Sequence, residues 1–390
     1  KGQIVDHPMF AKAMGAGYAI FTATHVAGFR QWQSPGYPYG LRQAPWRGGK
    51  ADIVRDFIES CRRYDIRPAL FISVRYNAYW HATHGIPVYG PRGMLYGQGG
   101  DTPLYRAYLR SCEEMVGELC GRYGELLEFW FDGGVMPPEG GGPDVLPIFE
   151  KYQPRGMFYH SRQRADHRWA GAEDGRVGDP CWSTITDVMS QYDAHGDAQK
   201  QKTLLRHGDP EGRAWVPAMA DAPIRNHNWF WRADETRLLR PAEELTAMYF
   251  ASVGRNANLV LGLIPGGDGL IPEADAAVCR EFGRQARAPF ATPAGETSGR
   301  GATLELRLPK PSRVDTVIVM EDIATGQRVR EFVVEGLAPG GQWVELARGE
   351  SVGYKRIERL AGRDLVGLRI RATRSPSVPA WRKLAAFTAG

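Results

Sequence analysis

Phe129-Trp130-Phe131-Asp132-Gly133-Gly134 is an apolar, aromatic-rich run that stops at one carboxylate and two glycines. A continuous apolar run is typical of a strand that is buried on both faces of a parallel sheet. The glycines are expected to end the strand and to let a ligand approach the backbone. Asp132 is therefore predicted at the C-terminal end of an interior strand, where barrel and open α/β enzymes place their chemistry. The alternative is that Asp132 only caps the next loop.

Strand-like and helix-like segments alternate on both sides of this run. Segments typical of strands begin near residues 18, 69, 128, 157, 168, 215 and 258. Helical spacing of apolar residues is found between them, as in 52–64, 104–123, 242–253 and 272–285. The alternation predicts a parallel sheet built from βαβ units. Since a (β/α)8 barrel needs one more strand than this count, we predict a TIM-like barrel that lacks its first strand. A doubly wound open sheet is the alternative, but no glycine-rich phosphate loop follows an early strand.

The composition changes after Pro289. A Pro/Gly/Ser/Thr-rich stretch is followed by short segments of period-two alternation, at 303–308, 316–320, 328–334 and 366–371. This pattern predicts an antiparallel β-sandwich, which either packs against the barrel, as we favour, or binds sugar. The predicted domains are a catalytic barrel over 1–290, a linker over 291–301 and the sandwich over 302–390.

Charge and cysteine content exclude several classes of protein. The 49 basic and 44 acidic residues are spread along the 390-residue chain, and no basic run indicates nucleic acid binding. No apolar run is long enough to span a membrane. The five cysteines are odd in number and show no CxxC spacing, so neither a disulfide framework nor a zinc site is indicated. The 11 Trp and 16 Tyr suit either stacking on sugar-like ligands or a large aromatic core.

Polar and aromatic residues follow several of the predicted strands. Each has an ordinary structural explanation when taken alone, but together they gather at one end of the predicted barrel and indicate a binding site there. They are His25, Trp32, Ser73, Tyr76, Asp132 and His160. The run Trp229-Phe230-Trp231 is either core or a platform for a ligand.

Hydrolysis of a glycosidic bond requires two carboxyl groups, one to attack the anomeric carbon or activate water and one to protonate the leaving oxygen. If Asp132 is one of them, a second must lie beside it. Glu173 lies in the glycine-flanked segment Trp169-Ala-Gly-Ala-Glu-Asp-Gly175, which suits a loop that folds over a pocket. From spacing alone this loop can equally be a solvated turn. The candidates downstream of Asp132 are Glu139, Asp166, Glu173, Asp174, Asp179 and Asp221.

Several motifs, in the same order along the chain, are similar to those of one enzyme family. They are Phe129-Trp-Phe-Asp-Gly133, Thr24-His-Val-Ala-Gly-Phe29 with Trp32, Asn256-Ala-Asn-Leu-Val-Leu-Gly262, Thr325-Gly-Gln-Arg-Val329 and Ser351-Val-Gly-Tyr-Lys-Arg-Ile357. Together they resemble glycoside hydrolase family 29, the retaining α-L-fucosidases, over essentially the whole chain.

The resemblance implies roles for three residues. Asp132 matches the family's catalytic nucleophile. Glu173 matches the acid/base of the Trp-x-Gly-x-Glu segment found in the subgroup that acts on branched α-1,3/1,4-fucosides. His25 matches the first His of the family's Lys-His-His-Asp-Gly-Phe segment, which binds sugar hydroxyls.

The sequence also departs from the family pattern. Val26 and Ala27 replace the second His and the Asp of that segment, and Met219 stands where many relatives carry a Glu. The family's first strand, with its own sugar-binding His, is not found in this chain, which agrees with the strand count. The resemblance therefore implies a missing N-terminus and a secreted or periplasmic protein. Its compartment and oligomeric state are not indicated by the residues.

The resulting hypothesis is a retaining exo-α-L-fucosidase that needs no cofactor and no metal and acts on a fucosylated oligosaccharide or glycoconjugate. Trp169 and Trp182 are expected to desolvate Glu173 and raise its pKa. A non-catalytic carbohydrate-binding barrel and a retaining glycosidase for another sugar are the alternatives. The predicted contacts to ring hydroxyls are His25, Trp32, Tyr76 and His160, and the predicted apolar contacts to the fucose methyl group are Phe29, Trp130 and Trp231.

Overall fold

The computed structural model describes residues 7–83, 86–87, 102–188 and 198–388, so most of the loop predicted at 75–103 lies outside the described residues. The chain forms two compact units, Lys1–Asp166 with Gly267–Leu270, and His167–Gly266 with Ile271–Gly390. No helix in the described parts of the chain is both long and apolar enough to cross a bilayer.

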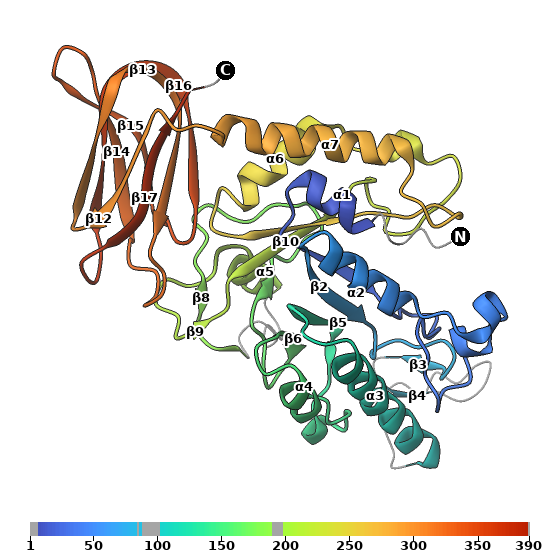
Figure 1. Ribbon diagram of the computed structural model, residues 1–390. Helices are drawn as coiled ribbons and strands as arrows, with labels where there is room; N and C mark the ends of the chain where they lie inside the picture. Colours follow the sequence, from blue (N-terminus) through green and yellow to red (C-terminus); the bar gives the residue numbers. More distant parts are fainter. Residues whose placement is uncertain (1–6, 84–85, 88–101, 189–197, 389–390) are drawn as a thin grey trace. The chain divides into compact units, whose positions relative to one another are not determined.

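The first unit alternates strands and helices (Figure 1). Its elements are α1 (His7–Met14), β1 (Tyr18–Thr22), α2 (Ile53–Arg63), β2 (Arg67–Ile72), β3 (Ala82–Thr83), β4 (Ile86–Pro87), α3 (Pro103–Arg122), β5 (Glu128–Val135), α4 (Leu146–Tyr152) and β6 (Met157–Ser161). Four strands form a parallel sheet in the order β1-β2-β5-β6. The short strands β3 and β4 pair with each other.

Alternation along these strands separates two faces of the sheet. Phe129, Phe131 and Phe158 belong to the hydrophobic core that also contains the buried faces of α2 and α3. Trp130 lies between the two core phenylalanines in sequence, so its side chain points to the opposite face. There it is aligned with Phe71 on β2 and with Tyr159 on β6. The helices therefore cover one face, and an aromatic row lines the other.

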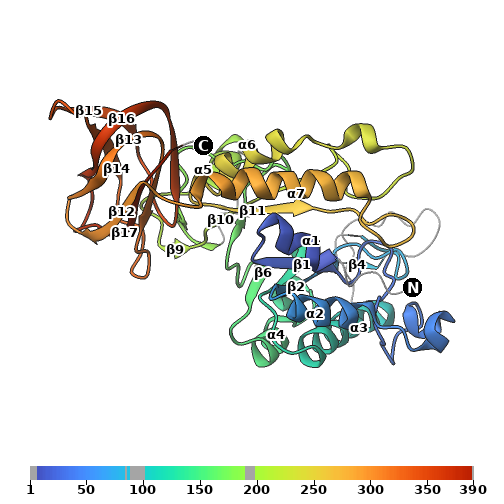
Figure 2. The same cartoon turned by 45° about the horizontal axis from the view of Figure 1, so that its top comes forward.

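The second unit contains two different kinds of sheet. Its elements are β7 (Arg168–Trp169), β8 (Thr184–Ile185), α5 (Ala198–His207), β9 (Ala214–Trp215), β10 (Ala218–Pro223), α6 (Ala242–Ser252), β11 (Asn258–Gly262), α7 (Glu273–Arg287), β12 (Gly295–Arg300), β13 (Thr303–Glu321), β14 (Glu331–Leu337), β15 (Trp343–Gly349), β16 (Arg356–Arg374) and β17 (Ala380–Phe387). A parallel sheet has the order β11-β10-β7, and a six-stranded antiparallel sheet has the order β12-β17-β13-β16-β14-β15. The helices α6 and α7 lie side by side (Figures 1 and 2).

Asn256 joins the parallel part of this unit to the antiparallel sheet. Its amide nitrogen donates to the Cys181 carbonyl at 3.1 Å and to Ser183 Oγ at 2.9 Å, while its Oδ1 accepts from the Tyr354 amide at 2.7 Å. A Cβ on Gly353 would lie 2.2 Å from the Asn256 side chain, so only glycine fits there. Two of the sequence motifs named above, at 256–262 and 351–357, therefore meet in one hydrogen-bond network.

The structure confirms the predicted α/β region with parallel strands followed by an antiparallel β region. The strand predicted at 215–219 is instead two strands, β9 and β10, which are separated at Pro217, a residue without an amide hydrogen. The stretch predicted as a linker contains β12, an edge strand whose residues alternate between half-buried and exposed. Its Gly, Ser and Thr content concealed this alternation. The closed barrel, the sandwich and the domain boundaries stay predictions.

Candidate active site

The pairing between β5 and β6 is interrupted at Asp132. Trp130 pairs with Tyr159, but the next pair joins Val135 to Ser161, so four residues of β5 oppose one residue of β6. A bulge of this kind bends a strand and re-aims a side chain, and bulges are frequent beside active sites. The expectation that the glycines end the strand is wrong, because β5 continues through them to Val135.

Gly133 and Gly134 provide the backbone conformation of this bulge. Their φ angles are +64° and +80°, in the left-handed region that glycine adopts without steric cost. A Cβ on Gly133 would lie 2.9 Å from Arg75 Cδ, and one on Gly134 would lie 2.8 Å from His160 Cε1. Arg75 also donates from Nη1 to the Gly133 carbonyl at 2.8 Å. The absence of side chains thus lets Arg75 and His160 approach the backbone that follows Asp132.

His25 follows β1 and reaches Asp132. Its Nε2 lies 3.6 Å from Asp132 Oδ2, and the two side chains are 29% and 37% exposed. The imidazole ring stacks on Phe71 at a centroid distance of 5.5 Å and an interplanar angle of 5°. Burial lowers the pKa of His25, and the negative charge of Asp132 only partly opposes this effect. At neutral pH His25 is therefore mainly an uncharged imidazole that can donate to and accept from a hydroxyl group.

The other predicted residues of the first unit lie at different depths. Tyr76 and Phe29 are half-buried, with the Phe29 ring edge-on to Tyr39 at 5.2 Å. Trp130 is only 9% exposed, and its ring centroid lies 5.7 Å from that of Phe71 and 5.0 Å from that of Tyr159. Trp130 therefore has little exposed surface to offer a ligand.

Trp32 lies elsewhere than predicted. Its side chain is fully buried, and its indole N–H donates to Glu118 Oε2 on α3 at 2.7 Å. A tryptophan whose only polar group is already bonded, and which has no exposed surface, has nothing to offer a sugar hydroxyl. Trp32 is a core residue, and we remove it from the predicted sugar contacts.

In the second unit, Glu173 lies on an exposed loop after β7. Its Oε2 accepts a hydrogen bond from the indole of Trp229 at 2.8 Å. A Cβ on Gly262 would lie 2.3 Å from the Trp229 ring, so the ring packs directly on the backbone of β11. Trp231, two residues further on, is 43% exposed. Trp229 was missed as a site residue, because its sequence run suits a core as well as a ligand platform.

A second carboxylate of this unit, Asp221, lies within β10 and is 7% exposed. Burial raises the pKa of Asp221 to about 7, while the hydrogen bond from the indole of Trp169 at 2.7 Å opposes the rise and the negative charge of Glu173 adds to it. The sequence patterns indicated Asp221 as one of six candidate carboxylates downstream of Asp132. An Asp flanked by small apolar residues, as in Met219-Ala-Asp-Ala-Pro223, is the signal that indicates a buried acid.

The two tryptophans predicted to cover Glu173 have other contacts. The Trp169 indole donates to Asp221, and Trp182 is buried beneath the Arg330 guanidinium, whose carbon lies 5.1 Å from the ring centroid. The indole that bonds Glu173 is that of Trp229. The covering of Glu173 by Trp169 and Trp182 stays a prediction, and the bond from Trp229 was not predicted, because indole contacts between distant loops leave no pattern in the sequence.

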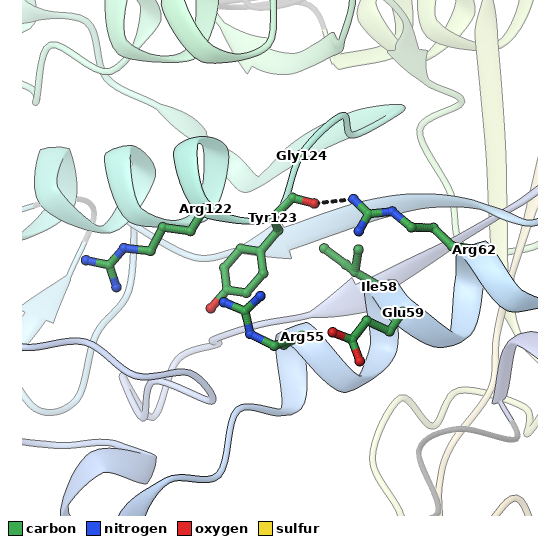
Figure 3. A pocket seen from close by; sticks show the side chains of 7 residues that line it. All are labelled: Arg55, Ile58, Glu59, Arg62, Arg122, Tyr123 and Gly124. Carbon is green, nitrogen blue, oxygen red and sulfur yellow. Dashed lines mark hydrogen bonds between the residues drawn. The ribbon is translucent and has the colours of Figure 1, made fainter.

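A surface depression of about 190 Å³ between α2 and α3 is not the site (Figure 3). Its three arginines already have partners: Arg55 lies over the Tyr123 ring at 5.1 Å, Arg62 donates to the Tyr123 carbonyl, and Arg122 donates to the Gln33 carbonyl at 2.8 Å. None of the predicted site residues lines it. The lining residues are Arg55, Ile58, Glu59, Arg62, Arg122, Tyr123 and Gly124.

The chain is similar to known proteins over most of its length. A family profile described as alpha-L-fucosidase matches residues 8–287. The chain is 29% identical to Alpha-L-fucosidase 1 of Arabidopsis thaliana, over 90% of this chain and 71% of that protein. A solved structure from Bacteroides thetaiotaomicron, described as a candidate alpha-L-fucosidase, is 41% identical with a TM-score of 0.92, over 100% of this chain and 88% of that one. A glycoside hydrolase 29 family member from an unknown rumen bacterium is 26% identical with a TM-score of 0.80, over 100% and 69% of the two chains.

We expect Gly134→Ala to damage the bulge. Alanine at this position would have to adopt an unfavourable positive φ, and its methyl group would lie 2.8 Å from the His160 ring. The free energy of unfolding should therefore fall by about 2 to 4 kcal/mol. Gly269→Ala is the matched control, because Gly269 has the same φ of +80° with no atom within 4 Å. It should cost only about 1 kcal/mol. Urea denaturation of both variants measures the difference, and equal losses would mean that the His160 contact does not constrain the bulge.

Proposed function

The chain belongs to the α-L-fucosidases of glycoside hydrolase family 29, and from this premise we propose that it removes terminal α-linked L-fucose by double displacement through a fucosyl-aspartate. The observation that carries the proposal is the β5 bulge, which presents a partly exposed carboxylate, Asp132, beside a histidine that burial keeps largely uncharged. Because the chain is an α-L-fucosidase, the non-catalytic binding barrel and the enzyme for another sugar are not retained.

In the first step, a carboxylate oxygen of Asp132 forms a bond with the anomeric carbon of fucose. The bond between that carbon and the glycosidic oxygen breaks, and Glu173 donates its proton to the departing oxygen. In the second step Glu173 removes a proton from water, whose oxygen attacks the same carbon and releases Asp132. Two inversions at one carbon retain its configuration.

The residues around Asp132 suit the binding of a sugar. His25 and His160 can hydrogen-bond ring hydroxyls, since neither needs to be charged for that role. We add Arg75 to this group, because it reaches the backbone beside Asp132 through its bond to the Gly133 carbonyl. Tyr76, in the segment between β2 and β3, completes the proposed polar set.

The methyl group of fucose requires an apolar contact. The candidates carried forward are Phe29 and Trp130 in the first unit and Trp231 in the second, of which Trp231 has the largest free ring surface, at 43% exposed. An exposed indole is also suited to stacking on the sugar that leaves. We propose a fucosylated oligosaccharide or glycoconjugate as the substrate, and branched α-1,3/1,4-fucosides in particular, because Trp169-Ala-Gly-Ala-Glu173 matches the motif of that subgroup.

We expect Asp132→Asn to abolish turnover, because an amide oxygen is a far weaker nucleophile than a carboxylate. The rate should fall by at least about 1,000-fold, given that loss of an enzymatic nucleophile can cost up to about 10⁶-fold. Hydrolysis of an aryl α-L-fucoside, with circular dichroism to verify folding, measures it. Glu139→Gln, an exposed carboxylate just beyond β5, is the control and should keep near-parental rates. A comparable loss in both variants, or none in Asp132→Asn, contradicts the assignment.

Glu173→Ala should separate substrates by their leaving groups. A fucosyl oligosaccharide needs protonation of its leaving oxygen and should slow by about 10² to 10⁴-fold, the range that general acid catalysis contributes. An aryl fucoside with an activated leaving group should slow much less in its first step, and azide should partly restore its turnover by attacking the fucosyl-enzyme in place of water. If both classes lose activity equally and azide has no effect, Glu173 is not the acid/base.

A further inference from the structure

The mechanism proposed above gives no role to Asp221, a buried carboxylate beside the loop of Glu173. Asp221 lies in the parallel strand β10, 7% exposed, and its Oδ1 accepts from the Trp169 indole at 2.7 Å. Trp169 ends β7 and is the register partner of Met219 on β10. The bond therefore crosses from one strand to its neighbour just before the loop that carries Glu173.

The same strand holds both ends of that loop. The Ala170 amide donates to the Met219 carbonyl at 2.9 Å, and the Gly175 amide donates to the Asp221 carbonyl at 2.8 Å. Gly175 has a φ of +68°, and a Cβ there would lie 2.8 Å from Met248, so the loop returns to β10 where only glycine fits. The segment 170–175 is thereby closed on β10, with Glu173 near its centre.

We propose that Asp221 is a positioning residue: through its bond to Trp169 it fixes the loop 170–175 and so orients the carboxylate of Glu173. The inference rests on the acid/base role of Glu173 proposed above. Two groups then orient Glu173. The Trp229 indole bonds its carboxylate directly, and Asp221 holds the backbone of the loop that carries it.

Burial and two nearby acids favour the protonated form of Asp221. The charged groups that the described residues place near it are Glu173 and Asp174, and Asp174 is paired with Arg206 on α5. Burial raises the pKa of Asp221 to about 7. A carboxyl group with a raised pKa favours the folded arrangement while it is protonated, and that contribution is lost as pH rises through the raised value. The Trp169 indole opposes this rise in pKa, because it donates more strongly to the ionised carboxylate, so the bond itself should persist above about pH 7.

Three variants test the bond. Asp221→Leu removes the acceptor at similar size, Trp169→Phe removes the donor, and Asp221→Asn keeps an acceptor but cannot ionise. On a fucosyl oligosaccharide, the Leu and Phe variants should each lose about 10- to 100-fold in kcat, part of what general acid catalysis contributes, and the double variant no more than either. On an activated aryl fucoside the loss should be a few-fold. Asp221→Asn should recover most of the activity, because its amide oxygen can still accept from the Trp169 indole.

Amide hydrogen exchange provides a readout that does not depend on turnover. In Trp169→Phe, exchange should become faster in peptides covering 170–175 and stay parental in β10 and β11. Unchanged exchange in the loop, or losses of activity that are equal for both substrates, would overturn the positioning role. If the parental protein hydrolyses no fucoside, the proposed function fails, and the exchange result still decides whether Asp221 holds the loop.

Discussion

The four-to-one mismatch between β5 and β6 is the constraint on which the surroundings of Asp132 depend. In a regular ladder, the pairing that aligns Phe71, Trp130 and Tyr159 would continue. The next side chain on that face, Asp132, would then be buried among side chains of the neighbouring strands. Gly133 and Gly134, both at positive φ, instead let the strand bulge at Asp132. At this bulge His25 Nε2 lies 3.6 Å from Asp132 Oδ2. The core on the opposite face is unaffected, because Phe129 lies before the break and Phe131 still pairs with Ile72 of β2. The glycine backbone of β5 thus places the Asp132 carboxylate at the edge of the regular pairing between β5 and β6.

The second unit meets a related requirement by different means. Glu173 is on a loop, and a loop carboxylate has no strand to orient it. Its neighbours supply that orientation: Trp229 bonds the carboxylate, and β10 accepts the backbone amides at both ends of the loop. The buried Asp221 lies where these bonds converge. In both units, parallel strands supply the rigid frame, and one or two residues just beyond the regular pairing carry the proposed chemistry.

Sequence patterns predicted the parallel strands and most helices, because apolar runs and helical spacing report burial directly. They put Asp132 on an interior strand, but at its end rather than within it. They did not predict the bulge, since a pair of glycines marks a strand end as readily as a bulge. They also assigned Trp32 to the site, because nothing in the sequence near this strand end indicates that the indole of Trp32 bonds Glu118. Trp229 and the bond between Trp169 and Asp221 depend on contacts between segments about 50 residues apart, which no local spacing encodes.

The central claim is that the Asp132 carboxylate bonds to the anomeric carbon. A fucosyl fluoride with fluorine at C2 tests it directly. The C2 fluorine slows both steps by destabilising their positively charged transition states, while the fluoride leaving group speeds the first step, so the fucosyl-enzyme accumulates. Protein treated with this reagent, digested and sequenced by mass spectrometry should carry one fluorofucosyl group on the peptide that contains Phe129–Gly134, at Asp132. A label on another carboxylate, or inactivation without a covalent label, would contradict the claim.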